Sequence, residues 1–215
     1  MTQPKLNGPH QGGALLRAGA SPETATTAMI LIHGRGASAQ DIMLLAEELP
    51  HPGMLYLAPQ ASGYTWYPYS FLSPIAQNEP GISSGLQVIA DLLEKLAGWG
   101  IPQERVVLAG FSQGACLTAE FIARRPQRYG GAFIFSGGVI GPPGMARQDE
   151  GNLADTPIFL GCGDPDSHIP RARVEETAEI FQRLGGDVVA QIYPGMGHTI
   201  NQAEIEQARA ILARF

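Results

Sequence analysis

The stretch Gly110-Phe111-Ser112-Gln113-Gly114 decides what fold and chemistry to expect of this chain of 215 residues. It follows the apolar run 105–109 and precedes residues 115–125, whose composition suits a helix. A serine at the apex of a strand–turn–helix unit has an exposed hydroxyl, and the flanking glycines permit the sharp turn. Such a hydroxyl attacks a carbonyl carbon when a base and an oxyanion site lie beside it. The stretch therefore predicts a serine hydrolase.

The remaining sequence alternates apolar segments with amphipathic ones, which predicts a single α/β domain over residues 1–215. Its central sheet should be mostly parallel, with helices on both faces, because most strand candidates are apolar at successive positions. The predicted strands are 28–32, 54–58, 106–109, 132–135, 157–160 and 188–193, with 13–18 as an added edge strand. Stripes of apolar residues predict helices at 38–49, 82–96, 174–184 and 205–212. Residues 1–12 are predicted to form a flexible N-terminal segment.

Two connections stand out by their length and composition. Residues 59–81 form a long loop rich in aromatic side chains, which favours a functional role over a passive one. Its aromatic residues are candidates for an apolar substrate pocket, or they pin the loop to the core: Trp66, Tyr67, Tyr69 and Phe71, with Leu72 and Ile75 beside them. The other connection, 136–156, is too short for a lid domain, so an open site without a separate lid is expected.

The base and the acid that a serine nucleophile needs follow two later predicted strands. His198 is the predicted base, because Gly195 and Gly197 free its loop to turn the ring over the sheet edge. His168 is its main rival, His33 is expected to support the loop after the first core strand, and His10 and His51 fall in predicted surface loops.

Two carboxylates compete for the role of the acid. Asp166 lies three residues after Gly163, a spacing that lets a tight turn aim its carboxylate inward, whereas Asp164 suits a turn residue that bonds its own backbone. Asp166 is therefore the predicted orienting acid.

The predicted oxyanion hole combines two backbone N–H groups. One belongs to Gln113, which follows the nucleophile and opens a helix, where amide donors are unpaired. The other is assigned to Arg35, within the segment His33-Gly34-Arg35-Gly36, where the glycines permit close approach of the backbone.

The composition excludes several partner classes. The formal net charge of −6 argues against nucleic acid, and no apolar run is long enough to span a bilayer, so no integral membrane association is expected. Residues 1–11 lack the apolar centre of a secretion signal, which favours a cytoplasmic location. Cys116 and Cys162 are expected to be buried free thiols. No metal or other cofactor is expected, because Asp164, Asp166 and His168 lie in one short loop without a second cluster. A homodimer is compatible with the sequence.

Four ordered segments resemble the phospholipase/carboxylesterase family of α/β hydrolases, the bacterial relatives of acyl-protein thioesterases. They are residues 33–38, the 110–114 stretch, residues 163–170 and residues 195–198, and the resemblance runs from about residue 28 to the C-terminus. It implies a lidless α/β-hydrolase fold, a triad of Ser112, Asp166 and His198, no metal, and hydrolysis of carboxylic esters or thioesters. Cys162 departs from the pattern, since many relatives carry histidine at that place.

The expected reaction is therefore that of a serine carboxylesterase acting through an acyl-enzyme. Few charged groups are available to hold a charged head group, so a small neutral ester of short or medium acyl chain is the expected substrate. The alternatives are cleavage of lysophospholipids or acyl thioesters on the same triad and, from another class, a binding module that keeps the fold without catalysis.

Overall fold

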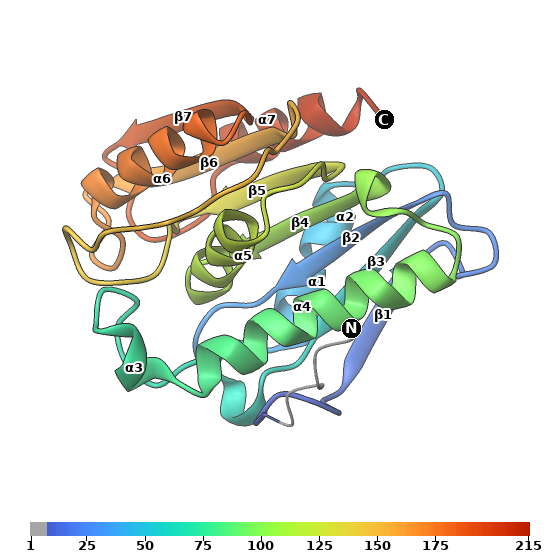
Figure 1. Ribbon diagram of the computed structural model, residues 1–215. Coiled ribbons are helices and arrows are strands. Elements are labelled where there is room, and N and C mark those ends of the chain that lie inside the picture. The colour runs from blue at the N-terminus through green and yellow to red at the C-terminus, as the bar shows by residue number, and fades with distance from the viewer. Residues whose placement is uncertain (1–7) are drawn as a thin grey trace.

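The computed structural model describes residues 8–215 and contains one seven-stranded sheet (Figure 1). The strand order is β1-β3-β2-β4-β5-β6-β7, with β1 antiparallel to β3 and every other neighbouring pair parallel. The strands are β1 (Leu15–Gly19), β2 (Thr27–Ile32), β3 (Met54–Pro59), β4 (Val106–Phe111), β5 (Gly131–Phe135), β6 (Pro157–Asp164) and β7 (Asp187–Pro194). The predicted mostly parallel sheet with an added edge strand is confirmed.

Helices cover both faces of the sheet, as predicted. The face that carries Ile30 packs against α4, α5 and α6, and the face that carries Leu31 packs against α1, α2 and α7. Successive residues of β2 thus enter opposite core layers, which explains why its sequence is apolar throughout. The helices are α1 (Ala39–Met43), α2 (Leu45–Glu48), α3 (Ile75–Asn78), α4 (Gly81–Gly98), α5 (Gln113–Arg124), α6 (Arg171–Arg183) and α7 (Gln202–Leu212), with short 3₁₀ turns η1 (Ser62–Tyr64) and η2 (Gln103–Arg105).

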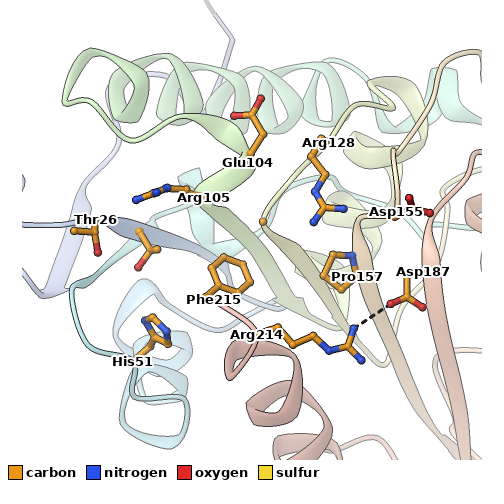
Figure 2. A pocket seen from close by; sticks show the side chains of 12 residues that line it. Thr26, His51, Glu104, Arg105, Arg128, Asp155, Pro157, Asp187, Arg214 and Phe215 are labelled. Atoms are coloured by element: carbon orange, nitrogen blue, oxygen red, sulfur yellow. Dashed lines mark hydrogen bonds and ion pairs between the residues drawn. The ribbon is translucent and has the colours of Figure 1, made fainter.

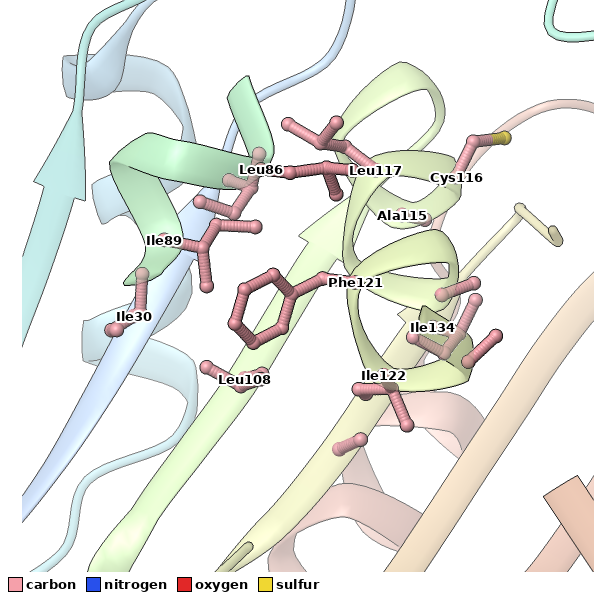
Figure 3. Close-up of a cluster of buried hydrophobic side chains, with 14 of the residues drawn as sticks. Ile30, Leu86, Ile89, Leu108, Ala115, Cys116, Leu117, Phe121, Ile122 and Ile134 are labelled. Carbon is pink, nitrogen blue, oxygen red and sulfur yellow. The ribbon is translucent and has the colours of Figure 1, made fainter. Parts of the chain in front are cut away.

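The helix that follows the serine is fixed by its core contacts. Figure 3 shows Phe121 of α5 beside Ile89 of α4 and over Leu108 of β4, in one cluster of buried side chains. Phe121 has only 1% of its surface exposed. Truncating a phenylalanine buried to this degree costs about 3–5 kcal/mol, so this contact holds α5 firmly against the sheet. The N-terminus of α5, where the serine lies, is fixed with it.

The predicted helix 38–49 is two short helices that break at Leu44. Ser38 and Asp41 form a capping box at the start of α1, and Leu44 ends α1 and begins α2. The break leaves Leu44 with 62% of its surface exposed, while Leu45 and Leu49 keep their places in the core.

The N-terminal part of the chain gives one correction. His10 is buried, not in a surface loop: its Nε2 donates to the carbonyl oxygen of Trp66 (2.8 Å), and its Nδ1 accepts from the Ser62 amide (3.1 Å). Burial lowers the pKa of His10 despite the bond to Trp66, which keeps the ring in the neutral form that this pairing needs. Residues 1–7 of the segment predicted to be flexible lie outside the described residues.

The connection between β5 and β6 forms no lid domain and is tied down by ion pairs. The carboxylate of Glu120, 1% exposed, accepts from Arg147 Nη1 (3.0 Å) and from the Ile140 amide (2.8 Å). Arg147 also pairs with Asp149 through its Nε (2.6 Å). These contacts hold the loop against α5 and leave the serine edge of the sheet uncovered.

No helix within residues 8–215 has the length and apolarity that crossing a bilayer requires. Both cysteines are buried and unpaired, as expected. The cytoplasmic location and the homodimer stay predictions.

Candidate active site

Ser112 lies at a sharp turn between β4 and α5, in the place that the sequence predicts. Its backbone is left-handed (φ 56°, ψ −119°), a conformation that non-glycine residues rarely adopt. A Cβ on Gly114 would overlap the backbone carbonyl of Ile32, so only glycine permits this approach of α5 to β2. The turn thereby places the serine hydroxyl at the carboxyl end of the sheet.

His198 and Asp166 meet Ser112 at this edge. His198 Nε2 lies 2.8 Å from Ser112 Oγ, and His198 Nδ1 lies 2.8 Å from Asp166 Oδ2. The aspartate follows β6 and the histidine follows β7, so the loops of two neighbouring parallel strands bring them together. The Asp166 side chain has no exposed surface, and the His198 side chain is 17% exposed.

Hydrogen bonds fix the protons in this chain of three groups. Burial would raise the pKa of Asp166, but hydrogen bonds from His198 and from the amides of His168 and Ile169 outweigh it and hold the pKa below its usual value. The carboxylate is therefore ionised and accepts the proton of His198 Nδ1. His198 Nε2 is left to accept from the Ser112 hydroxyl, which is the arrangement that a general base requires.

The structure separates the rival residues from these roles. Asp164 ends β6 with its side chain 47% exposed and lies 3.7 Å from Arg171, so it is a surface ion-pair partner and not the predicted residue that bonds its own backbone. The His168 ring packs edge-on against His198, 4.7 Å between centroids, and its backbone amide orients Asp166. His33 is buried under its own loop, where it accepts from the Ala61 amide (3.1 Å), as expected of a supporting residue.

The two predicted oxyanion donors flank the serine. Gln113 is the first residue of α5, so its amide has no acceptor within the helix. Arg35 lines the same cavity as Ser112 and Gln113, with Gly34 between β2 and the serine turn. The structure thus brings both residues to the site.

The side chains of these two residues hold the aromatic loop, a function that the sequence did not reveal. Gln113 Nε2 donates to the Tyr67 carbonyl (2.8 Å), and its Oε1 accepts from the Trp66 amide (2.8 Å). The Arg35 guanidinium donates to the carbonyls of Pro68 (2.8 Å) and Tyr69 (2.6 Å). The residues of the predicted oxyanion hole therefore also position the wall of the cavity.

A cavity of about 440 Å³ opens over Ser112 and His198. Tyr67, Tyr69 and Phe71, three of the residues predicted to bind substrate, line it. Trp66 does not: it has no exposed surface, its indole N–H donates to the His33 carbonyl (2.9 Å), and it pins the loop to the core. Trp66 therefore fits the second interpretation of this loop, and substrate binding by Tyr67, Tyr69 and Phe71 stays a prediction.

A second cavity, of about 350 Å³, opens at the amino ends of the strands, far from the serine turn (Figure 2). Three arginines and three acids line it, and one pair of them, Arg214 and Asp187, forms an ion pair (3.1 Å). It contains His51 but no serine or cysteine to act as a nucleophile. Within residues 8–215, no three histidine, cysteine or acidic side chains gather as a metal centre would require.

Comparison with known proteins identifies the family. The model of the phospholipase/carboxylesterase family matches residues 16–214. The chain belongs to this family. It is therefore an ester-hydrolysing enzyme of the esterase and thioesterase kind, with the α/β-hydrolase fold.

Relatives within the phospholipase/carboxylesterase family cover nearly the whole chain. The crystal structure of a phospholipase/carboxylesterase from Dyadobacter fermentans is 37% identical, covers 94% of this chain and 97% of its own, and superimposes with a TM-score of 0.90. The structure of esterase PE8 is 27% identical over 94% of this chain and 97% of its own, with a TM-score of 0.75. The acyl-protein thioesterase 1 of Kluyveromyces lactis is 27% identical over 93% of this chain and 96% of its own length.

Proposed function

We propose that the protein is a serine carboxylesterase in which Ser112 is the nucleophile, His198 the general base and Asp166 the group that orients it. The observation that carries the proposal is the pair of 2.8 Å contacts, from Ser112 Oγ to His198 Nε2 and from His198 Nδ1 to Asp166 Oδ2. Both contacts lie within the range in which a proton is transferred along a hydrogen bond. A fold kept only for binding has no need of a serine aligned in this way.

In the acylation half of the reaction, Ser112 Oγ attacks the ester carbonyl carbon while His198 Nε2 takes the hydroxyl proton. The carbonyl oxygen becomes an oxyanion, which the amides of Gln113 and Arg35 stabilise. When the intermediate collapses, the bond to the alkoxy oxygen breaks, and His198 gives its proton to the departing alcohol. The Asp166 carboxylate stabilises the imidazolium in between.

In the deacylation half, water takes the place of the alcohol. His198 removes one proton from the water as its oxygen attacks the acyl carbon, and then returns the proton to Ser112 Oγ as the carboxylic acid leaves. The enzyme ends in its starting state. No cofactor takes part in either half.

The proposed substrates are neutral esters of short or medium acyl chain. Tyr67 and Phe71 are almost fully buried and present apolar surface to the cavity, and Arg35, which also lines it, is engaged by backbone carbonyls. An apolar cavity with few free polar groups favours an uncharged acyl arm. Hydrolysis of acyl thioesters is the second candidate, because several relatives are acyl-protein thioesterases.

The test of the serine mechanism compares Ser112→Ala with Ser70→Ala, which alters another serine that lines the cavity. We expect Ser112→Ala to lower kcat for p-nitrophenyl butyrate by at least about 10³-fold and to abolish labelling by a fluorophosphonate probe. Ser70→Ala should keep both. Undiminished turnover by Ser112→Ala, or a wild-type protein that the probe does not label, would exclude the mechanism.

The substrate class is tested with matched oxygen esters and thioesters of acyl chains from two to sixteen carbons. We expect kcat/KM to peak at or below about eight carbons, and the oxygen esters to be cleaved at least as well as the thioesters. A maximum at sixteen carbons, with thioesters preferred, would favour the thioesterase alternative.

A further inference from the structure

A third cavity, of about 500 Å³, lies directly beside the serine cavity. The two cavities share Gly34, Ala37 and Phe111, so they meet at the residue that precedes Ser112. The Phe111 ring lies 4.9 Å from the His198 ring, between centroids. The residues shared by the two cavities therefore include one that packs against the ring of the proposed general base.

The third cavity presents mainly apolar side chains. Its apolar lining comes from the loop after β2, from α1 and α2, from the serine turn and from the loop after His198: Ala37, Ile42, Leu44, Leu45, Phe111 and Ile200. Leu44 is the most exposed large hydrophobic residue among residues 8–215, because the break between α1 and α2 turns it out of the core. Isolated surface leucines need no explanation, but this one borders an apolar hollow that adjoins the serine cavity.

The rim of the third cavity is acidic. Asp41, Glu47 and Glu48 line it, and its lining includes His33 but no lysine or arginine. Hydrogen bonds from Ser38 hold the pKa of Asp41 below its usual value, and Glu48 is paired with Arg209 on the protein surface (3.2 Å). An anionic group placed in the cavity would meet like charges, so its chemistry suits an uncharged apolar group.

We propose that the third cavity binds the alcohol arm of the ester and makes the enzyme selective for esters of neutral apolar alcohols. This proposal rests on the proposed esterase function. The acyl and alkoxy arms of an ester leave the carbonyl carbon in different directions, so a substrate bound at Ser112 needs two spaces. The alkoxy oxygen has to lie near His198 Nε2 to receive its proton. From there the alcohol extends past the Phe111 ring into the third cavity. The acyl arm occupies the serine cavity, which Tyr67 and Phe71 line.

The same geometry disfavours lysophospholipids whose head group carries no cation. Their alcohol part carries a phosphate, which would enter the acidic rim formed by Asp41, Glu47 and Glu48. The acidic rim therefore separates the carboxylesterase from a lysophospholipase that acts on such lipids.

The acyl-enzyme mechanism makes a sharp test available. All acetate esters give the same acetyl-enzyme, so a dependence of kcat/KM on the alcohol reports acylation and the space that the alcohol occupies. In the wild-type protein, we expect kcat/KM of acetates from methyl to octyl to rise about twofold for each added methylene. This is about half the free energy of burying a methylene fully, because the cavity is open to solvent. In a parallel series, methyl esters of acids from acetic to octanoic hold the alcohol constant.

Leu44→Ser is the decisive variant, because it removes an exposed apolar side chain from the third cavity only. We expect it to lower kcat/KM for octyl acetate about tenfold, to leave methyl acetate unchanged, and to leave the acyl series parallel to that of the wild-type. Val189→Ser, which alters an exposed residue outside both cavities, should change neither series. Glu47→Gln should raise kcat/KM about threefold for 6-carboxyhexyl acetate and leave heptyl acetate unchanged.

Three results would overturn the proposal. One is a flat dependence on alcohol length in the wild-type protein, and another is an equal loss on methyl and octyl acetate in Leu44→Ser. The third is a change of molecular mass in Leu44→Ser by light scattering, which would make the cavity a contact between copies of the chain. Failure of the wild-type protein to hydrolyse any ester of either series would instead overturn the proposed esterase function.

Discussion

His198 Nε2 lies 2.8 Å from the Ser112 hydroxyl oxygen, although 86 residues separate the two along the chain. The serine follows β4 and the histidine follows β7, three strands away in the sheet. Only the loop after β7, reaching back along the sheet edge past Asp166, closes this distance. The proposed activity therefore depends on how precisely the loop after β6 holds the aspartate that orients the histidine.

Asp166→Asn is expected to keep the fold and to lower kcat at least about 100-fold. The Oδ1 atom of asparagine can still accept from the amides of His168 and Ile169, which turns its amide nitrogen toward His198 Nδ1. His198 Nδ1 must then accept a hydrogen bond, which leaves the single proton of the neutral ring on Nε2, so Nε2 no longer accepts from Ser112. Steady-state kinetics and circular dichroism measure the two expectations.

Asp164→Asn is the matched control, because this exposed carboxylate lies two residues before Asp166 and pairs with Arg171 on the surface. It should keep kcat within about twofold of the wild-type value. If Asp164→Asn lost activity as strongly as Asp166→Asn, the assignment of the two carboxylates would be wrong.

Arg35→Ala is expected to raise KM about tenfold with a smaller change in kcat. The variant keeps the backbone amide that we assign to the oxyanion hole but loses the guanidinium that holds the carbonyls of Pro68 and Tyr69. Without these bonds, the cavity wall is less ordered and binds substrate more weakly. A net loss of about 1.4 kcal/mol in binding free energy corresponds to the tenfold rise in KM. Arg35→Lys should give an intermediate KM, since one ammonium group does not reproduce the forked geometry. An Arg35→Ala protein whose KM equals that of the wild-type would show that the side chain does not position the wall.

Glu120→Ala is expected to lower the free energy of unfolding by about 3 kcal/mol, measured by urea denaturation. Its buried carboxylate accepts from Arg147, Arg124 and the Ile140 amide, and removing it leaves the buried guanidinium of Arg147 with one carboxylate, Asp149, and the Ile140 carbonyl. Glu175→Ala, which breaks the exposed pair with Arg171, is the control and should unfold at nearly the same urea concentration as the wild-type. Equal stability of the two variants would contradict the view that this ion-pair cluster fastens the 136–156 loop.

The sequence predicted what local pattern and strand order encode. The glycines beside Ser112 reveal the turn, and the apolar runs reveal the strands whose carboxyl ends gather Asp166 and His198 at one edge. These features depend on neighbours along the chain, which a single sequence displays. The capping box of Ser38 and Asp41 was predictable for the same reason.

Contacts between distant side chains could not be predicted in this way. His10 with Trp66, Gln113 with Tyr67 and Arg35 with Tyr69 join residues that are 34 to 56 positions apart, with no periodicity to mark them. The break at Leu44 was also hidden, because the apolar stripe of 38–49 continues through it. Trp66 is buried because its indole N–H pairs with the His33 carbonyl, a contact that the sequence does not reveal. Its aromatic side chain would have suited a substrate pocket equally well.

A buried acid, Glu204, predicts a pH dependence of stability. Burial raises the pKa of Glu204 to about 7, against the lowering effect of the Asn201 amide, and its Oε1 has no hydrogen-bond partner. Because the folded pKa lies above the unfolded value of 4.5, the folded protein holds this proton more tightly than the unfolded chain. The free energy of unfolding should therefore fall as the pH rises from about 4.5 to about 7, by at most about 3 kcal/mol from this group. Glu204→Gln mimics the protonated acid. In the capping box, Glu204 accepts a hydrogen bond from the Asn201 backbone amide (2.8 Å), and the glutamine Oε1 can accept the same bond.

Urea denaturation of the wild-type protein and Glu204→Gln at pH 5 and pH 8 measures this effect. From pH 5 to pH 8, the free energy of unfolding of the variant should rise by about 2 kcal/mol relative to that of the wild-type protein, because glutamine cannot ionise. Glu206→Gln, which alters an exposed acid on the same helix, is the control and should follow the wild-type curve. If stability depended on pH in the same way for Glu204→Gln and the wild-type protein, Glu204 would ionise in the folded state as readily as in the unfolded chain. Its burial beside Gly161 would then not disfavour the charged form.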